Sequence, residues 1–427
     1  MLAQELAIAH GLLQNRSFGE AAPLYLQAIH DTPEVSPAWE GLLASLAGLG
    51  MADEALALVE TRQQRFQDGL SFYFNALARM IASGLADIGR TLIVATPDNS
   101  LLCIVARYFS GMIELHGGRP SDAAAHFAAA GVMAEKFAVQ FWSDPFLCKI
   151  VTEGPLFQDF AALGELMARD RAEIIAEAGV IAPVAQFHTP SGGEAPFVVC
   201  AGMNEAYFDR FGAEAIAAAE AALGEVSGAA FHFHIVDPTP ALDEKIVRLR
   251  ELAPSLRIGL STETYRHAIQ GYGRAEYYAC ARFLRAPEIM VHYRAPLMIV
   301  DADMAWLAHA AHVMTSFGNG SYGCFEQHWQ FPSNICHASL VAVGAGAAAH
   351  RFADLAAKLI VRRVVSHSFW MLDQLSLLVA SRYLMTADPE FRAVGMAEAA
   401  GLSFDACFMS SGTAKEKQAM RKAAIAA

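Results

Sequence analysis

The stretch PLMIVDADM, from Pro296 to Met304, joins an apolar run to two aspartates. The apolar residues predict a short buried strand that delivers Asp301 and Asp303 at its carboxyl end. Because one residue separates them, both carboxylates can reach one divalent cation on the same side of an extended chain. A Mg or Mn ion held there would bridge diphosphate oxygens. Two acidic residues after a strand are also common in solvated turns, so the surrounding sequence is needed to distinguish a metal site from a turn.

Strands and helices alternate on both sides of this stretch. The predicted strands are 197–201, 231–236, 257–260 and 296–300, and the predicted helices are 211–223, 243–252, 277–284, 348–365 and 369–384. Alternation of this kind favours a mostly parallel α/β sheet with helices on both faces. Ligands of such sheets bind at the carboxyl ends of the strands, which is where the two aspartates are expected.

A different periodicity fills the first third of the chain. Small residues recur every 34 positions, at Ala21, Ala55, Gly89 and Ala123. A small residue at each site lets the second helix of a helical hairpin pack closely on the first, and the pattern resembles tetratricopeptide repeats. Two of the four units match well and two match loosely. The sequence predicts an all-α repeat domain whose concave face binds a protein segment, with a plain alanine-rich bundle as the alternative.

Proline and glycine mark the predicted domain boundary. The segment PVAQFHTPSGGEAP, residues 183–196, has three prolines and two glycines without apolar periodicity, as expected of a linker. The expected organisation is therefore a helical repeat domain at 1–182, this linker, an α/β domain at 197–417 and a polar tail at 418–427.

The composition narrows the classes of function. Of the 427 residues, 54% are hydrophobic and 18% are charged, which predicts a globular protein. The net charge of -13 opposes binding to nucleic acid. The apolar stretches are too short to span a bilayer, so no membrane span is expected. The seven cysteines are scattered without a C-x-x-C pair and fit neither a disulfide framework nor a zinc ribbon, which favours a cytoplasmic location.

Two histidine pairs raise the question of a metal. His232 and His234 alternate on a predicted strand, whereas His309 and His312 lie three apart on a predicted helix. Either spacing could ligate a metal ion. Hydrogen-bonded histidines at the edge of a core are the commoner explanation, so no zinc is assigned.

The segment YYACARFLRAPEI at 277–289, followed by the D-x-D stretch, resembles the core of glycosyltransferases of the GT-A fold. This resemblance implies an α/β, Rossmann-like domain that binds a nucleotide diphospho-sugar. It also implies that Tyr278 and Arg282, on the helix before the D-x-D strand, line the nucleotide pocket. Arg282 would offset phosphate charge as the nucleotide leaves.

The first predicted strand of the α/β domain carries the same resemblance. CAGMNEAYF, at 200–208, is similar to the nucleotide-contacting start of these enzymes. The residues carried over as nucleotide contacts are Asn204, Glu205 and Tyr207. Many members of the group have an aspartate where Asn204 stands.

Two downstream segments extend the resemblance. FWMLDQLSLL, at 369–378, resembles the helix on which related enzymes carry an aspartate that faces the sugar and the acceptor. Asp373, with Gln374 beside it, is carried over as the group that orients or deprotonates the acceptor. MSSGTAKEK, at 409–417, resembles a segment that folds over the diphosphate. Its expected contacts are Ser411, Gly412 and Lys415. The histidine metal ligand that some members have there is absent, so the third protein ligand stays open.

The combination of the two domains is similar to the flagellin glycosyltransferases of alphaproteobacteria. In that group the repeats hold flagellin and the second domain attaches a sugar, typically a nonulosonic one, to serine or threonine hydroxyls. The resemblance implies an enzyme that moves a sugar from a nucleotide donor to a protein acceptor such as flagellin. A nonulosonic sugar would be carried by a nucleotide monophosphate, and this weakens the argument for a metal-bound diphosphate. The alternative is a non-catalytic adaptor or chaperone with a degenerate sugar-nucleotide-binding domain.

Overall fold

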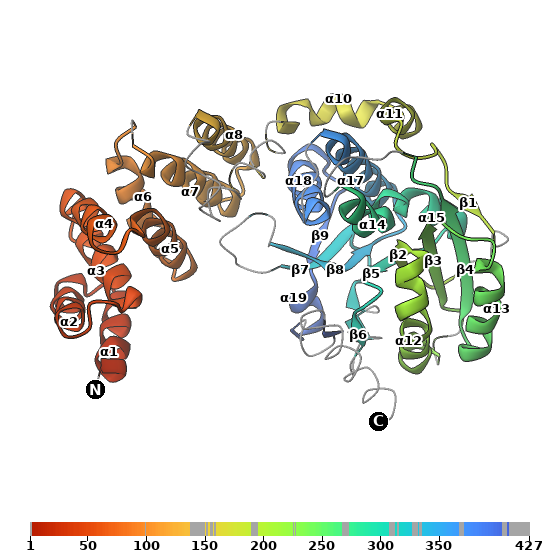
Figure 1. The fold of residues 1–427 in the computed structure, drawn as a ribbon, viewed down its shortest axis with the longest axis horizontal. Coiled ribbons are helices and arrows are strands. Elements are labelled where there is room, and N and C mark those ends of the chain that lie inside the picture. Colours follow the sequence, from red (N-terminus) through yellow and green to blue (C-terminus); the bar gives the residue numbers. More distant parts are fainter. Residues whose placement is uncertain are drawn as a thin grey trace. The chain divides into compact units, whose positions relative to one another are not determined.

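The structure is a computed structural model of the chain, shown in Figure 1. It describes residues 2–136, 150–188, 195–266, 273–306, 312–326, 332–366, 371–403 and 408–409, except for positions 99, 151–152, 154–156, 158, 225, 227, 314–315 and 333–334. The chain divides into two compact units. Unit 1 comprises Met1–Ala161 and His328–Pro332, and unit 2 comprises Ala162–Gln327 and Ser333–Ala427.

Unit 1 is helical. Its helices within residues 2–136 are α1 (Leu2–Gln14), α2 (Phe18–Asp31), α3 (Ser36–Gly48), α4 (Ala52–Phe66), α5 (Gly69–Ala82), α6 (Ala86–Ala95), α7 (Leu102–His116) and α8 (Pro120–Lys136). Each of these helices contacts the next along the chain (Figure 1). Such nearest-neighbour packing is typical of helical repeat architectures.

The 34-residue period is visible in the helix boundaries. The helices α2, α4, α6 and α8 begin at residues 18, 52, 86 and 120, so the starts are evenly spaced. Ala21, Ala55, Gly89 and Ala123 are each the fourth residue of their helix, and all four are buried. Small buried residues at these positions allow the paired helices to pack closely. The predicted helix pairs are confirmed, whereas membership of the tetratricopeptide family stays a prediction.

Unit 2 contains a mixed sheet whose order, within the described residues, is β1-β4-β3-β2-β5-β8-β7-β9. The strands are β1 (Gln186–Phe187), β2 (Val198–Asn204), β3 (Ala230–Val236), β4 (Arg257–Glu263), β5 (Leu297–Val300), β7 (Tyr322–Glu326), β8 (Cys336–Val343) and β9 (Ala393–Gly395). The four central strands β4, β3, β2 and β5 are parallel. A separate pairing joins β6 (Ala305–Trp306) to β10 (Phe408–Met409).

Helices cover both faces of this sheet (Figure 1). One face carries α12 (Glu205–Leu223) and α13 (Leu242–Leu252). The other face carries α14 (Gly273–Leu284), α15 (Ala286–Tyr293) and α17 (Ala347–Ser366). The helix α18 (Leu372–Ala387) packs on β8 and α17. Alternation along β2 separates the faces, because Val199, Ala201 and Met203 enter the core beneath α12 whereas Gly202 faces α14. No helix in the described ranges is both long and apolar enough to cross a bilayer.

The four predicted parallel strands are confirmed, and the outer strands are the main addition. The strands β7 and β8 pair antiparallel with each other, and β8 pairs antiparallel with β5, so the sheet is mixed. Within the predicted linker, β1 pairs with β4. Two short helices, α10 (Leu163–Ala168) and α11 (Arg171–Ala178), fall in the predicted helical domain but pack on α17 of unit 2.

A buried polar network runs across β3 and β4 on the α15 side. His232 Nδ1 lies 3.0 Å from the Tyr293 hydroxyl, and its Nε2 lies 2.8 Å from Ser261 Oγ. His234 Nδ1 is 2.8 Å from the same Ser261 oxygen, and its Nε2 makes a 3.2 Å contact with Glu263. Both histidines are fully buried. The hydrogen-bonded interpretation of this pair is therefore confirmed.

This network makes the stability of unit 2 dependent on pH. Burial lowers the pKa of His232 well below its ordinary 6.5, and nearby His234 and His292 lower it further. The folded state therefore keeps His232 neutral while the unfolded chain takes up a proton below about pH 6.5. Stability should fall as the pH decreases below that value, by up to about 1.4 kcal/mol per pH unit.

Glu263 adds a second loss of stability at lower pH. Burial raises its pKa, but His234, Arg285 and Tyr277 outweigh burial and lower the pKa to about 2. Because the folded pKa lies below the ordinary 4.5, the stabilisation is complete above 4.5 and is lost as the pH falls toward 2. Hydrogen exchange of β3 and β4, corrected for intrinsic rates, should show the opening free energy decreasing from pH 6.5 downward.

Two histidine variants test this expectation. His232→Gln should flatten the profile between pH 6.5 and 4.5, because a glutamine takes up no proton in either state. His30→Gln changes a histidine whose side chain is 83% exposed in unit 1 and should leave the profile of β3 and β4 unchanged. The same pH dependence in His232→Gln as in the unchanged protein would contradict the assignment.

Candidate active site

The sheet of unit 2 has a topological switch point between β2 and β5. From β2 the chain moves to β3 and then β4 on one side, whereas β5 pairs parallel on the other side of β2. Ala201 of β2 is level with Val300 of β5, so Asp301 follows directly at the carboxyl edge. Ligands of open α/β sheets bind in the crevice outside the strand ends at such a point. The structure therefore places Asp301 where the sequence predicted a ligand site.

Gly202 lets α14 pack directly on the end of β2. A Cβ at this position would lie 2.7 Å from the backbone nitrogen of Arg282 and 2.8 Å from its Cβ. Because the first of these atoms belongs to the helix backbone, no side-chain rotation can relieve the clash. The glycine thus brings Arg282 over the switch point.

Arg282 connects two of the predicted site aspartates. Its guanidinium forms an ion pair with Asp301, lies 3.4 Å from Asp373 Oδ2 and donates to the Ala338 carbonyl at 3.3 Å. Only 4% of Arg282 is exposed. The backbone N–H of Asp301 donates to the Ser339 carbonyl of β8 at 3.0 Å. The antiparallel strand β8 therefore helps to hold both partners of the ion pair.

Asp373 reaches the site from the first turn of α18. Its Oδ1 accepts a hydrogen bond of 2.8 Å from the Gln374 backbone N–H. Burial raises the pKa of Asp373; the Arg282 guanidinium lowers it, and the Asp301 carboxylate raises it again, with a net upward shift. A carboxylate that takes up a proton more readily than usual is better matched to acid–base chemistry near neutral pH.

These groups surround a small cavity of about 100 Å³. Its polar lining residues are Glu276, Arg282, Asp301, Ser339, Asp373 and Gln374. Four of them were predicted site residues, and the structure brings these four together from α14, β5 and α18. Glu276 was not predicted. Its only sequence signal is that it lies on the same helix as Tyr278 and Arg282.

A second polar cluster lies at the end of β3. Asp237 follows this strand with a positive φ of 56°, which an aspartate tolerates better than most residues. It accepts hydrogen bonds of 2.9 Å from the Tyr278 hydroxyl and from Arg274, and one of 2.8 Å from the Tyr265 N–H. The Tyr278 hydroxyl is therefore held at the end of β3, and its contact with a nucleotide stays a prediction. Asp237 was not predicted.

The three predicted site residues at the end of β2 and the start of α12 make contacts within the fold. Asn204 caps α12 by accepting the Tyr207 N–H at 2.9 Å. Glu205 is 5% exposed and accepts hydrogen bonds from Thr239 and, at 2.6 Å, from Lys245. The Tyr207 ring packs on Phe211 with a centroid distance of 4.5 Å and is 37% exposed. Nucleotide contacts from these three residues stay a prediction.

The described residues do not complete a metal site. No group of three or more histidine, cysteine, aspartate or glutamate side chains in these ranges could hold a metal ion. Asp301 is already paired with the Arg282 cation, and Asp303 follows it in a turn. Ser411, Gly412 and Lys415 lie outside the described residues, as does His309. Binding of Mn or Mg by the D-x-D pair stays a prediction, and no chemical step below passes through a metal.

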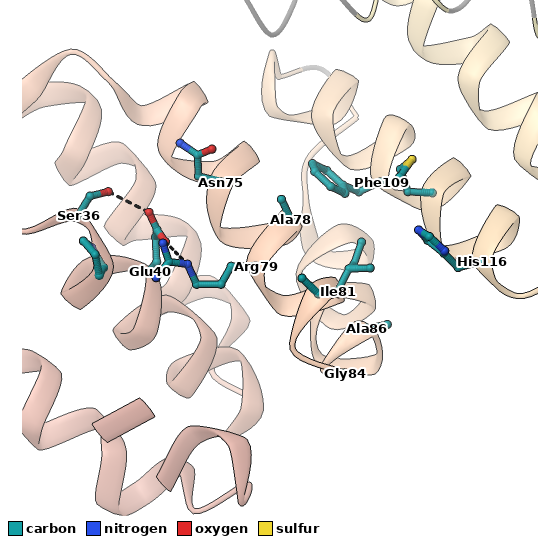
Figure 2. A pocket seen from close by; sticks show the side chains of 13 residues that line it. Ser36, Glu40, Asn75, Ala78, Arg79, Ile81, Gly84, Ala86, Phe109 and His116 are labelled. Atoms are coloured by element: carbon teal, nitrogen blue, oxygen red, sulfur yellow. Dashed lines mark hydrogen bonds and ion pairs between the residues drawn. The ribbon is translucent and has the colours of Figure 1, made fainter. Parts of the chain in front are cut away.

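Unit 1 has a larger cavity of its own. Figure 2 shows this groove, about 960 Å³ in volume, lined by side chains of α3, α5 and α7 with the start of α6. Glu40, 4% exposed, accepts a hydrogen bond of 2.9 Å from Ser36 and pairs with Arg79 at 2.7 Å. Apolar side chains, among them Ile81 and Phe109, line the rest. The groove is at the upper end of the volume range for small-ligand sites.

Comparison with known proteins adds little. No family model matches the chain, and no curated protein matches it. Among solved structures, one that is similar is mouse xyloside xylosyltransferase 1 in its apo form, with 10% identity and a TM-score of 0.28 over 47% of this chain and 84% of that chain. A superposition this loose at this identity carries no argument about activity.

Proposed function

We propose that unit 2 is a glycosyltransferase that takes a sugar from a nucleotide donor. The observation that carries the proposal is the convergence of Arg282, Asp301 and Asp373 on one cavity at the β2–β5 switch point. In the sequence, all three belong to the segments that resemble such enzymes. The D-x-D stretch follows β5 directly, beside the strand end where α/β sheets bind their ligands.

The charges around the cavity suit a sugar better than a phosphate. Asp301, Asp373 and Glu276 supply three carboxyl groups against the single guanidinium of Arg282. Carboxylates repel phosphate oxygens but accept hydrogen bonds from hydroxyl groups. We therefore place one edge of the donor's sugar at the cavity. Its nucleotide would lie toward the Asp237–Tyr278 cluster at the neighbouring strand end.

Asp373 is the proposed acid–base residue. Its raised pKa and its position in the cavity suit it to accept the proton of an attacking hydroxyl as the bond from sugar to nucleotide breaks. Arg282 holds Asp301 and Asp373 in place as a positioning residue. The groove of unit 1 would bind the protein acceptor, and the resemblance implies a flagellin-like protein modified on serine or threonine hydroxyls. Such binding raises the effective concentration of the acceptor.

Donor binding and turnover test the proposal directly. UDP-, GDP- and CMP-sugars, with and without Mn, should include one that raises the melting temperature of the protein, because a ligand that binds only the folded state stabilises it. That donor should be hydrolysed slowly. Asp373→Asn and Asp303→Asn should each lower the hydrolysis rate by about 10²-fold or more if these carboxylates act in the reaction.

The outcomes separate the enzyme from its alternative. Glu244→Gln, on the exposed side of α13, serves as the matched control and should hydrolyse the donor normally. Binding of a sugar nucleotide without turnover would favour the non-catalytic adaptor. If no donor raises the melting temperature, both the glycosyltransferase and the sugar-nucleotide-binding adaptor are rejected. A rate that is insensitive to EDTA would remove the proposed metal while leaving Asp373 in its role.

A further inference from the structure

Met371, directly before α18, has a backbone conformation that methionine rarely adopts. Its φ is 80° and its ψ is 18°, in the left-handed region. A bulky residue is an outlier there, whereas glycine adopts this conformation without steric cost. Glycine has it at two other helix ends of unit 2, Gly179 and Gly401. The backbone at position 371 therefore favours glycine over methionine.

Helix capping does not explain the methionine either. The residue before a helix is usually serine, threonine, aspartate or asparagine with an extended backbone, and its side chain accepts an N–H of the first turn. The Met371 side chain makes no such bond, while its backbone carbonyl accepts the Leu375 N–H at 3.2 Å. Any residue could supply that carbonyl. The reason for a methionine at this position therefore lies in what its side chain contacts.

Met371 lines the cavity at the β2–β5 switch point. The other apolar lining residues are Ala279, Cys280, Ala338 and Leu372. Cys280, Ala338 and Leu372 are at most 2% exposed, so they belong to the packed wall. Met371 is partly exposed and much larger than Ala279, which is also partly exposed. It is therefore the large apolar residue that a molecule at the cavity can reach.

The position and chemistry of Met371 indicate contact with a ligand. Asp373, the proposed acid–base residue, lies two residues further on and lines the same cavity. Strained backbone conformations cluster at active sites, where the fold holds a residue in place for its function. A methionine side chain is flexible and polarisable and adapts its shape to the apolar groups that it contacts. A matching ligand has hydroxyl groups for the polar wall and one apolar substituent for Met371.

We propose that Met371 is a specificity-determining residue that packs on a methyl-bearing substituent of the donor's sugar, such as an acetamido group or the methyl group of a deoxy sugar. This inference rests on the proposed function. Burying a methyl group against the methionine removes apolar surface from water, whereas a hydroxyl group at the same place would lose hydrogen bonds to water. The protein should therefore prefer methyl-bearing sugars over their more polar counterparts.

The test compares pairs of donors that differ at this substituent. The pairs are UDP-GlcNAc with UDP-glucose, CMP-N-acetylneuraminate with CMP-N-glycolylneuraminate, and GDP-fucose with GDP-L-galactose, each titrated by calorimetry. For the nucleotide that binds, the methyl-bearing donor should bind at least about fourfold more tightly, as expected from burying one methyl group. Met371→Ala should remove most of this preference. Met371→Leu, which keeps an apolar side chain of similar volume, should retain it.

Thermal unfolding separates this role from a structural one. Truncating a methionine packed in the core to alanine would lower the melting temperature by about 5 °C or more. Because Met371 is partly exposed at the cavity, Met371→Ala should cost less than about 2 °C. Met371→Gly should melt above Met371→Ala, because glycine relieves the left-handed backbone. Met385→Ala, at a 51%-exposed methionine further along α18, is the matched control and should leave the affinities and the melting temperature unchanged.

The outcomes distinguish the inference from the proposed function. A fall of about 5 °C or more in Met371→Ala would make Met371 a structural residue and overturn the inference, as would an undiminished preference in that variant. Donors that bind without a preference for the methyl-bearing partner would also overturn it while leaving donor binding intact. An unchanged protein that binds none of these donors would reject the proposed function, and this inference with it.

Discussion

Arg282→Met should lower the free energy of unfolding of unit 2 by about 3–5 kcal/mol, the range for removing one partner of a buried ion pair. The methionine fills much of the space but leaves Asp301 and the 6%-exposed Asp373 without their cation. Urea unfolding, together with hydrogen exchange of α14 and α18, measures the loss. The exposed Arg250→Met should cost less than about 0.5 kcal/mol.

The dependence of this loss on pH identifies its cause. Without Arg282, an ionised Asp373 is costly in the buried site, so the loss should shrink as the pH falls and that carboxyl takes up a proton. Adding Asp373→Asn to Arg282→Met should recover part of the stability, because the remaining buried charge is then removed. Strictly additive losses, or a total loss below about 1 kcal/mol, would show that the ion pair is not what holds α14 and α18 together.

The residues that the sequence located are those with a local signal. The apolar run ending in Asp301 predicts a strand and its polar end within a few residues, and the structure has both. The 34-residue period likewise reflects repeated local packing, and it recurs in the starts of α2, α4, α6 and α8. Asp373 was located because the stretch FWMLDQLSLL that contains it resembles the corresponding helix of related enzymes.

What the sequence did not predict depends on contacts between distant segments. Glu276 lines the cavity from α14, the helix that packs on Gly202 through Arg282, a contact between residues far apart in the chain. Asp237 accepts its hydrogen bonds from a backbone conformation with a positive φ, and the neighbouring residues in the sequence do not indicate this conformation. The strand β1 is two residues long and is defined by its pairing with β4, so its segment has the composition of a linker. Local pattern and propensity contain none of this information.

A second large effect should come from Arg285, which is fully buried beneath β4. Its guanidinium donates to Glu263 at 2.5 Å and to Glu288 at 2.9 Å, and it reaches the Ala182 carbonyl at 2.6 Å and the Pro183 carbonyl at 3.2 Å. Arg285 thus ties the segment before β1 to the sheet. Arg285→Met should lower the free energy of unfolding by about 3–5 kcal/mol, since it leaves Glu263 buried without its cation.

Because the planar guanidinium of Arg285 contacts four groups at once, Arg285→Lys is an informative second variant. A lysine keeps the charge but places it at one point and cannot reach two carboxylates and two carbonyls together, so it should recover only a small part of the loss. Hydrogen exchange of residues 180–188 should rise in both variants. The part of the acid-dependent loss of stability that Glu263 causes should also be smaller and should end at a higher pH than in the unchanged protein, because Glu263 no longer has the guanidinium that helps to lower its folded pKa to about 2. A lysine variant as stable as the unchanged protein would mean that charge alone, and not the four-way contact, holds β1 and α15 to the sheet.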